Sequence, residues 1–147
     1  MARSVRVSVE RSVAAPPERV YQMLADYRDT RRRILTANYL DYRVEEGGTG
    51  AGTVISYRLQ AAGRERSYRL RVETPAINTL VERDTASSLV TTWRVMRAPN
   101  AASIVRLVTE WQAAPGIRGL FERTFAPRGL RRIYDELLRR LEEVLTG

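Results

Sequence analysis

The hydrophobic positions near the N-terminus change their spacing at a pair of prolines. Before the prolines, valines recur at every second or fourth residue between positions 5 and 13, which is the spacing of a strand with one buried face. After them, Val20, Leu24 and Tyr27 keep the i, i+4, i+7 spacing of one helix face. Pro16 or Pro17 suits the first turn of a helix, because the N–H that proline lacks would have no intrahelical partner there. The pattern predicts a strand, a stiff corner and a helix, and segment 27–35 can form a short second helix.

Apolar and polar residues alternate through most of the chain between residues 39 and 113. Short loops separate the alternating stretches, and the glycine-rich GGTGAG (47–52) is typical of a hairpin turn. It lacks the Gly-Lys-Ser/Thr sequence and the following helix of a phosphate-binding loop. The alternation predicts six strands, of which NTLVERD (78–84) is short and ambiguous. The more apolar faces of the other five carry Leu40, Tyr42 and Val44; Thr53, Ile55, Tyr57 and Leu59; Tyr68, Leu70 and Val72; Leu89, Thr91, Trp93 and Val95; and Val105, Leu107, Thr109 and Trp111.

Beyond Pro115 the apolar positions follow a period of 3.6 residues, which predicts a long amphipathic helix. A similar stripe continues upstream through Leu120, so we expect the helix to begin near Ile117. Pro127 lies inside this helix and should kink or break it there. The main stripe consists of Leu130, Ile133, Tyr134, Leu137, Leu138, Leu141, Val144 and Leu145.

This order of elements predicts an α+β fold in a single domain of residues 1–147. A long antiparallel sheet with one apolar face needs a cover, and the C-terminal helix supplies it. A chain of this length buries roughly 70% of its unfolded surface, enough for a core without disulfides. The sequence contains no run of about 18 apolar residues and no signal-peptide apolar region, so we expect no transmembrane segment and a cytoplasmic location.

The composition excludes several kinds of chemistry. Cysteine and histidine are both absent, which rules out Ser-His-Asp and Cys-His mechanisms and thiolate metal sites. A zinc site would have to consist of carboxylates alone. Proton transfer would have to use Asp, Glu, Tyr or water, and we expect no cofactor and no metal.

The net charge of +8 raises the possibility of nucleic-acid binding. All 25 basic residues are arginine, and they are scattered among acidic residues, as in RERSYRLRVE and RRIYDELLRRLEE. This distribution favours a solvated, arginine-rich surface, so we do not expect a nucleic-acid partner.

The chain resembles the START/Bet v 1-like superfamily, in particular its bacterial polyketide cyclase/dehydrase-like (SRPBCC) branch. The resemblance rests on VERSVAAPPERVYQMLADY, EEGGTGAGTVISYRL and LRRIYDELLRRLEEVL, and it spans nearly the whole chain. It implies a helix-grip fold, in which a curved seven-stranded antiparallel sheet surrounds a long C-terminal helix and leaves a hydrophobic cavity. It also implies an apolar small-molecule ligand such as a lipid, sterol or polyketide, but no shared catalytic set. We expect a monomer or a homodimer.

If such a cavity exists, inward strand positions and the inner helix face should line it. Aromatic side chains provide apolar contact, and their O–H and N–H groups can orient a ligand. The same side chains can also simply fill the core. The candidate ligand-binding residues on these elements are Tyr57, Tyr68, Leu70, Thr91, Trp93, Trp111, Phe121, Phe125 and Tyr134.

Arg11 is a further candidate because its position places it on the apolar face of the first strand. A lone buried charge is costly, so Arg11 must reach water, pair with a carboxylate or bind an acidic ligand group. Glu110 and Glu82 are the carboxylates we expect as structural partners.

Three functions remain compatible with the sequence. The first is binding or transport of an apolar small molecule. The second is a polyketide aromatase/cyclase or dehydratase, in which Tyr57, Tyr68 or Glu110 would act. The third is a partner-binding regulatory protein that uses the arginine run RRRIL (31–35), although a surface helix end explains that run equally well.

Overall fold

The computed structural model describes residues 3–113 and 126–147. Its seven strands are β1 (Arg3–Val13), β2 (Tyr39–Glu46), β3 (Val54–Ala61), β4 (Arg64–Glu73), β5 (Thr79–Asp84), β6 (Val90–Ala98) and β7 (Ala102–Ala113). Its helices are α1 (Pro17–Ala25), α2 (Thr30–Ile34) and α4 (Pro127–Thr146). The predicted order of one strand, two short helices, six strands and a long helix is confirmed.

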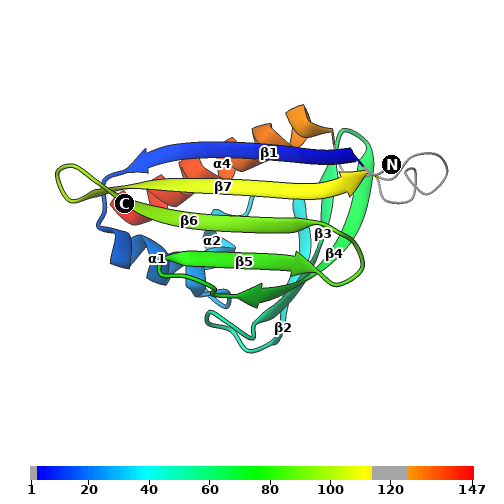
Figure 1. Cartoon of the computed structure of the whole chain (residues 1–147), viewed down its shortest axis with the longest axis horizontal. Coiled ribbons are helices and arrows are strands. Elements are labelled where there is room, and N and C mark those ends of the chain that lie inside the picture. The colour runs from blue at the N-terminus through cyan, green and yellow to red at the C-terminus, as the bar shows by residue number, and fades with distance from the viewer. Residues whose placement is uncertain (1–2, 114–125) are drawn as a thin grey trace.

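The strands form one antiparallel sheet in the order β1-β7-β6-β5-β4-β3-β2. Figure 1 shows that β1, β7, β6 and β5 run side by side, whereas β2, β3 and β4 turn across them, so the sheet is strongly curved. α4 lies behind β1 and β7 in this view, on the inner side of the curve, and packs against β1 and α2. This is the helix-grip fold that the resemblance implies.

The inner face of the sheet and the stripe of α4 make the core. In β7, Val105, Leu107, Thr109 and Trp111 are all buried, as their alternation predicts. In α4 the predicted stripe is buried from Leu130 to Leu145, apart from the half-buried Val144. Burying these side chains together stabilises the fold by roughly 25 cal/mol for each Å² of apolar surface removed from water.

The corner after β1 lies at the two prolines, as the sequence predicts. Pro17 is the first residue of α1, and Val20 and Leu24 on its inner face are buried. The Ser103 hydroxyl donates a hydrogen bond to the carbonyl oxygen of Ala15 at 2.7 Å and ties the corner to β7. The corner therefore carries the two short helices across one end of the curved sheet.

The structure differs from the sequence prediction in two details, one in a helix and one in a strand. Pro127 is the first residue of α4, where proline is tolerated, so it does not kink that helix. The predicted helical stretch that begins near Ile117 lies outside the described residues. In β2, the pairing with β3 shifts register between Leu40 and Arg43, and Asp41 has a φ of +53°. This β-bulge turns both Tyr39 and Tyr42 toward the inner side, which simple alternation does not allow.

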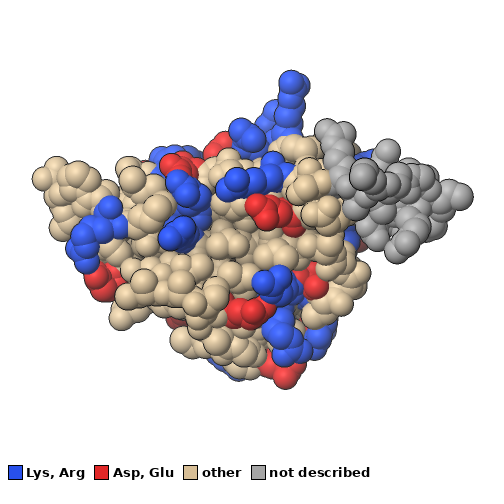
Figure 2. Space-filling model, viewed as in Figure 1, with Lys and Arg blue, Asp and Glu red and all other residues tan. Residues whose placement is uncertain are grey.

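The outer face of the sheet carries mixed charge. Figure 2 shows acidic and basic side chains interspersed on this face, with no single continuous basic area. Several of them pair across the strands, such as Arg6 with Glu110 and Arg106 with Glu10. Within the described residues, no helix is long and apolar enough to cross a membrane.

Candidate functional site

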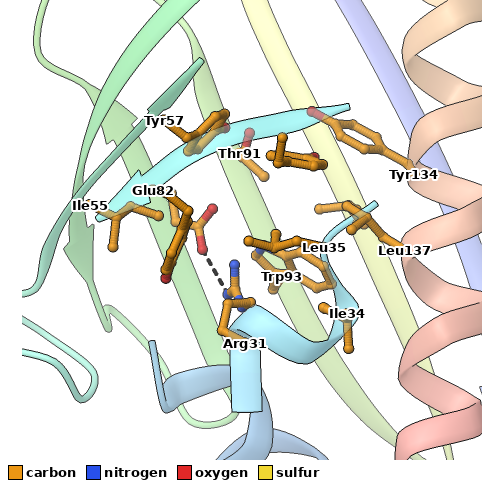
Figure 3. Close-up of a pocket in the computed structure, with 13 residues that line it drawn as sticks. Arg31, Ile34, Leu35, Ile55, Tyr57, Glu82, Thr91, Trp93, Tyr134 and Leu137 are labelled. Carbon is orange, nitrogen blue, oxygen red and sulfur yellow. Dashed lines mark hydrogen bonds and ion pairs between the residues drawn. The ribbon is translucent and has the colours of Figure 1, made fainter. Parts of the chain in front are cut away.

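A cavity lies between the inner face of the sheet and helices α2 and α4 (Figure 3). The whole hollow with its mouth spans about 400 Å³, but the interior space open to a water-sized body is only about 30 Å³. Since a water molecule needs roughly 10–15 Å³ on this measure, the interior holds about two water-sized bodies. The lining residues are Arg31, Ile34, Leu35, Tyr39, Tyr42, Ile55, Tyr57, Glu82, Thr91, Trp93, Leu107, Tyr134 and Leu137.

A buried ion pair forms one wall of the cavity. Arg31 Nη2 lies 2.8 Å from Glu82 Oε2, and the two side chains are only 5% and 4% exposed (Figure 3). The Tyr27 hydroxyl donates a hydrogen bond to the same Glu82 oxygen at 2.6 Å and accepts one from Arg31 Nη2 at 3.1 Å. Arg31 Nε donates to the carbonyl oxygen of Leu24 at 3.1 Å. The charges therefore neutralise each other inside the core.

The neighbouring backbone holds this cluster in place. The Tyr27 N–H donates to the carbonyl oxygen of Gly48 at 2.9 Å, and the Tyr42 hydroxyl donates to the carbonyl oxygen of Tyr27 at 2.7 Å. The β2–β3 hairpin is thus tied to the junction between α1 and α2. Arg31, in α2, is directed inward from that junction.

Arg31 stays charged in this setting. Burial by itself lowers the pKa of its guanidinium, but the Glu82 carboxylate beside it raises that pKa, and the net direction is upward. The guanidinium also lies over two aromatic rings, 4.4 Å from the Tyr27 centroid and 4.5 Å from the Trp93 centroid. These cation–π contacts add to the attraction that Glu82 provides.

A chain of three hydroxyl groups lies elsewhere in the cavity region. The hydroxyls of Thr91 and Thr109 are 2.7 Å apart, and those of Thr109 and Tyr134 are 2.5 Å apart. Thr91 and Tyr134 line the cavity, so this chain offers polar atoms from β6 and α4 to whatever enters it.

Five tyrosines line the cavity or support its ion pair, and we call them the cavity tyrosines. Their hydroxyl groups keep their protons well above neutral pH. Burial is the largest cause in every case, and it raises the pKa of Tyr42 to about 12. Their hydroxyls therefore act as neutral hydrogen-bonding groups. The cavity tyrosines are Tyr27, Tyr39, Tyr42, Tyr57 and Tyr134.

The cavity brings together some of the predicted ligand-binding residues and excludes others. Tyr57, Thr91, Trp93 and Tyr134 line it (Figure 3). Tyr68, Leu70 and Trp111 are buried in the core without lining it, and the Tyr68 ring lies 5.6 Å from that of Tyr57. Phe121 and Phe125 lie outside the described residues.

Arg11 pairs with a carboxylate that the sequence did not suggest. Its Nη2 lies 2.8 Å from Glu142 Oε1 on α4, and both side chains are about one-third exposed. Glu110, one of the two partners we expected, is half-exposed and pairs with Arg6 instead, so it does not line the cavity. Glu82, the other, pairs with Arg31.

Sequence reasoning missed the most polar part of the cavity. RRRIL is predicted to lie at the surface, as a partner-binding run or as a helix end, but its first arginine, Arg31, is 4% exposed. A signal was present, because Arg31 and Ile34 continue the helix-face spacing that runs from Val20 through Leu24 and Tyr27. Glu82 is expected from the sequence to pair with Arg11 and not with Arg31; its strand is ambiguous, although it alternates with Leu80 on the inner face.

The described residues contain no group of three or more His, Cys, Asp or Glu side chains that could hold a metal ion. The chemistry available in the cavity is therefore that of one carboxylate, one guanidinium, hydroxyl groups and an indole N–H.

The chain is similar to several known proteins. The family model for polyketide cyclase/dehydrase and lipid transport matches residues 4–146, and no curated protein matches the chain. Among solved structures, the KanY protein (ms6282) is 41% identical, with a TM-score of 0.87 and 99% of each chain covered. The Zhui aromatase/cyclase from Streptomyces sp. R1128 is 21% identical, with a TM-score of 0.64 over 96% of this chain and 88% of that one.

Norcoclaurine synthase from Thalictrum flavum, in complex with dopamine and hydroxybenzaldehyde, is 10% identical, with a TM-score of 0.70 over 99% of this chain and 88% of that one. At such identities the likeness to the aromatase/cyclase and to this synthase shows the fold alone. The chain belongs to the polyketide cyclase/dehydrase and lipid-transport family, in the START/Bet v 1-like superfamily, and has the ligand-binding fold of that superfamily.

Proposed function

We propose that this protein binds a small apolar molecule in the cavity between the sheet and α4, and that the molecule is a compact aromatic compound carrying oxygen atoms. The observation that carries the proposal is the make-up of the lining. Eight of its thirteen residues carry a polar side-chain atom, and five are aromatic. Such a lining provides apolar contact together with a few orienting hydrogen bonds.

The same lining argues against a plain hydrocarbon chain as the ligand. A lipid tail cannot hydrogen-bond to the hydroxyls of Tyr39 and Tyr57, which make no hydrogen bond to any described residue. Aromatic rings also suit the edge-to-face stacking of Tyr39 on Tyr57, whose centroids are 5.0 Å apart. The complex of norcoclaurine synthase with dopamine and hydroxybenzaldehyde shows that this fold accommodates small oxygenated aromatics.

Binding must widen the interior, because 30 Å³ is too little for an aromatic ring. Leu35, Tyr39, Tyr42 and Tyr57 are the partly exposed members of the lining, so the cavity meets the solvent beside them. The hollow of about 400 Å³ includes the open mouth, so most of that space lies outside the enclosed interior. A ligand would have to displace these side chains to enter the interior.

The test is a variant that fills the cavity. Leu137 lines it and is 2% exposed, so Leu137→Trp should occupy the space at a cost in stability of about 1–3 kcal/mol. Val108→Trp adds the same ring on the outer face of β7 and serves as the control. We expect N-phenyl-1-naphthylamine, a neutral fluorescent probe, to bind the natural chain and the control, and to bind Leu137→Trp at least fivefold more weakly. Equal binding by all three proteins, with folding checked by circular dichroism, would place the probe elsewhere and refute the proposal.

Catalysis is the second candidate, and the buried carboxylate favours it. Glu82 lines the cavity, whereas Glu110, the carboxylate expected from the sequence, does not. A cyclase or dehydratase would orient a poly-ketone chain and assist enolisation or loss of water. Turnover of such a substrate that falls in Tyr57→Phe, with probe binding unchanged, would support this reading.

A further inference from the structure

The indole N–H of Trp93 has no hydrogen-bond partner. Trp93 is 3% exposed, and its Nε1 is one of two buried side-chain nitrogen or oxygen atoms without a partner within the described residues. The other is Nε of Arg140, which lies on α4 and outside the cavity lining. A buried donor without an acceptor costs free energy, so a buried tryptophan normally has its N–H paired.

The immediate neighbours of Trp93 explain why its N–H is unpaired. It lies on the inner face of β6, and its partners across the adjacent strands are Leu80 and Leu107, whose side chains carry no acceptor. Arg31 covers the ring, and a guanidinium can only donate. These three neighbours thus provide no acceptor for the indole N–H.

Arg31 adds a second donor at the same place. Its Nε and Nη2 donate to Leu24, Tyr27 and Glu82, whereas Nη1 makes no hydrogen bond to any described residue. Arg31 and Trp93 both line the cavity and stack on each other, so two side chains of the same wall each carry a donor without a partner among the described residues.

We propose that Trp93 is a specificity-determining residue whose indole N–H donates a hydrogen bond to a neutral carbonyl oxygen of the ligand. The proposal rests on the proposed function and narrows it from oxygenated aromatics to those carrying a ketone, aldehyde or similar uncharged acceptor. A carbonyl oxygen has two lone pairs, so it can accept from Trp93 and from Arg31 Nη1 together.

The ion pair sets the preference for an uncharged acceptor. Glu82 already neutralises Arg31 at 2.8 Å, so a carboxylate ligand would bring a second negative charge close to Glu82. In the desolvated wall of the cavity such like-charge contact is costly, and no further cationic side chain lines the described cavity to offset it. A ketone receives the same hydrogen bonds without that cost.

The test measures the affinities of three ligands of similar shape for two proteins, the natural chain and Trp93→Phe. Acetophenone carries the carbonyl, α-methylstyrene replaces that oxygen by CH₂, and benzoate carries the negative charge. Trp93→Phe keeps an aromatic ring but removes the N–H together with part of the indole, so α-methylstyrene serves to measure the effect of the lost volume. We expect Trp93→Phe to weaken acetophenone binding about three- to tenfold more than it weakens α-methylstyrene binding, with benzoate binding weakest to both proteins. Calorimetry or displacement of the fluorescent probe measures all six affinities.

Nuclear magnetic resonance of the indole group gives an independent readout. The chain has two tryptophans, so two indole N–H signals are expected and Trp93→Phe assigns them. Acetophenone should move the Trp93 signal downfield, and α-methylstyrene should not. If Trp93→Phe weakens both neutral ligands equally, or if acetophenone leaves the indole signal in place, the N–H is not the donor and the inference fails while the proposed function stands. If none of the three ligands nor the fluorescent probe binds, the proposed function itself is overturned.

Discussion

Replacing Glu82 by glutamine should destabilise the fold more than any exposed charge replacement. Glu82→Gln leaves the guanidinium of Arg31 charged in a site where the two side chains are only 5% and 4% exposed. Removing one partner of a buried ion pair costs about 3–5 kcal/mol, against a total stability of about 5–15 kcal/mol. Glutamine retains one acceptor oxygen for Arg31 and Tyr27, so we expect a value near the lower end. With a urea m-value of about 2 kcal/mol per M, the midpoint should fall by about 1.5 M.

Urea unfolding followed by circular dichroism and tryptophan fluorescence measures this shift. Glu110→Gln is the matched control, because Glu110 pairs with Arg6 at 3.4 Å with both side chains more than half exposed, and its loss should cost less than about 1 kcal/mol. The variant Tyr27→Phe/Arg31→Met/Glu82→Leu removes both charges and the phenol that donates to Glu82, and it should recover most of the lost stability. If Glu82→Gln shifts the midpoint no more than Glu110→Gln, the pair is not a desolvated interaction and the reasoning is wrong.

Two other predictions concern alkaline pH and two glycines. Because the pKa values of the cavity tyrosines are raised above 10, their contribution to stability is complete below about pH 10 and is lost as pH rises toward the folded values, about 12 for Tyr42. Tyrosinate absorbance near 295 nm should therefore rise together with unfolding, and independent titration at about pH 10 would contradict this. Gly129→Ala should raise the melting temperature, since nothing lies within 4 Å of the added methyl in α4 and helical alanine is favoured over glycine by about 0.5–1 kcal/mol. Gly48→Ala should lower it by several degrees, because Gly48 has a φ of +152° and the added methyl would collide with Arg28; equal effects of the two changes would refute the argument.

The sheet and its buried face could be predicted because the residue pattern of each strand shows which of its two sides is apolar. Alternation in β3, β4, β6 and β7 identifies the inner face correctly, since one side of every strand packs against the core. The rule fails in β2, where the bulge at Asp41 adds one residue and brings Tyr39 inward beside Tyr42. A β-bulge depends on pairing with a neighbouring strand, so the sequence of β2 by itself does not show it.

The ion pair could not be predicted for a different reason. Arg31 lies in a run of three arginines whose other two members are exposed, and its partner Glu82 is 51 residues away on an ambiguous strand. Arg31 looks like ordinary surface charge in its own segment, and Glu82 is expected from the sequence to pair with Arg11. Only the curvature of the sheet brings β5 over α2, and curvature results from contacts between elements distant in sequence.

Arg11 and Glu82 show that the position of an inward-facing charged side chain in the sheet determines how the charge is satisfied. Arg11 faces inward from β1 at the edge of the sheet, where it reaches Glu142 on α4 and keeps about one-third of its side chain in water. Such a charge is satisfied locally and needs no ligand. Glu82 faces inward from β5 within the sheet, where the buried Arg31 and the Tyr27 hydroxyl satisfy it. Because well-packed apolar residues are often at least as stable as a buried ion pair, stability alone gives no reason to keep Arg31 and Glu82. Their position in the wall of the cavity, beside the unpaired N–H of Trp93, supplies that reason if the cavity holds a polar group of a ligand.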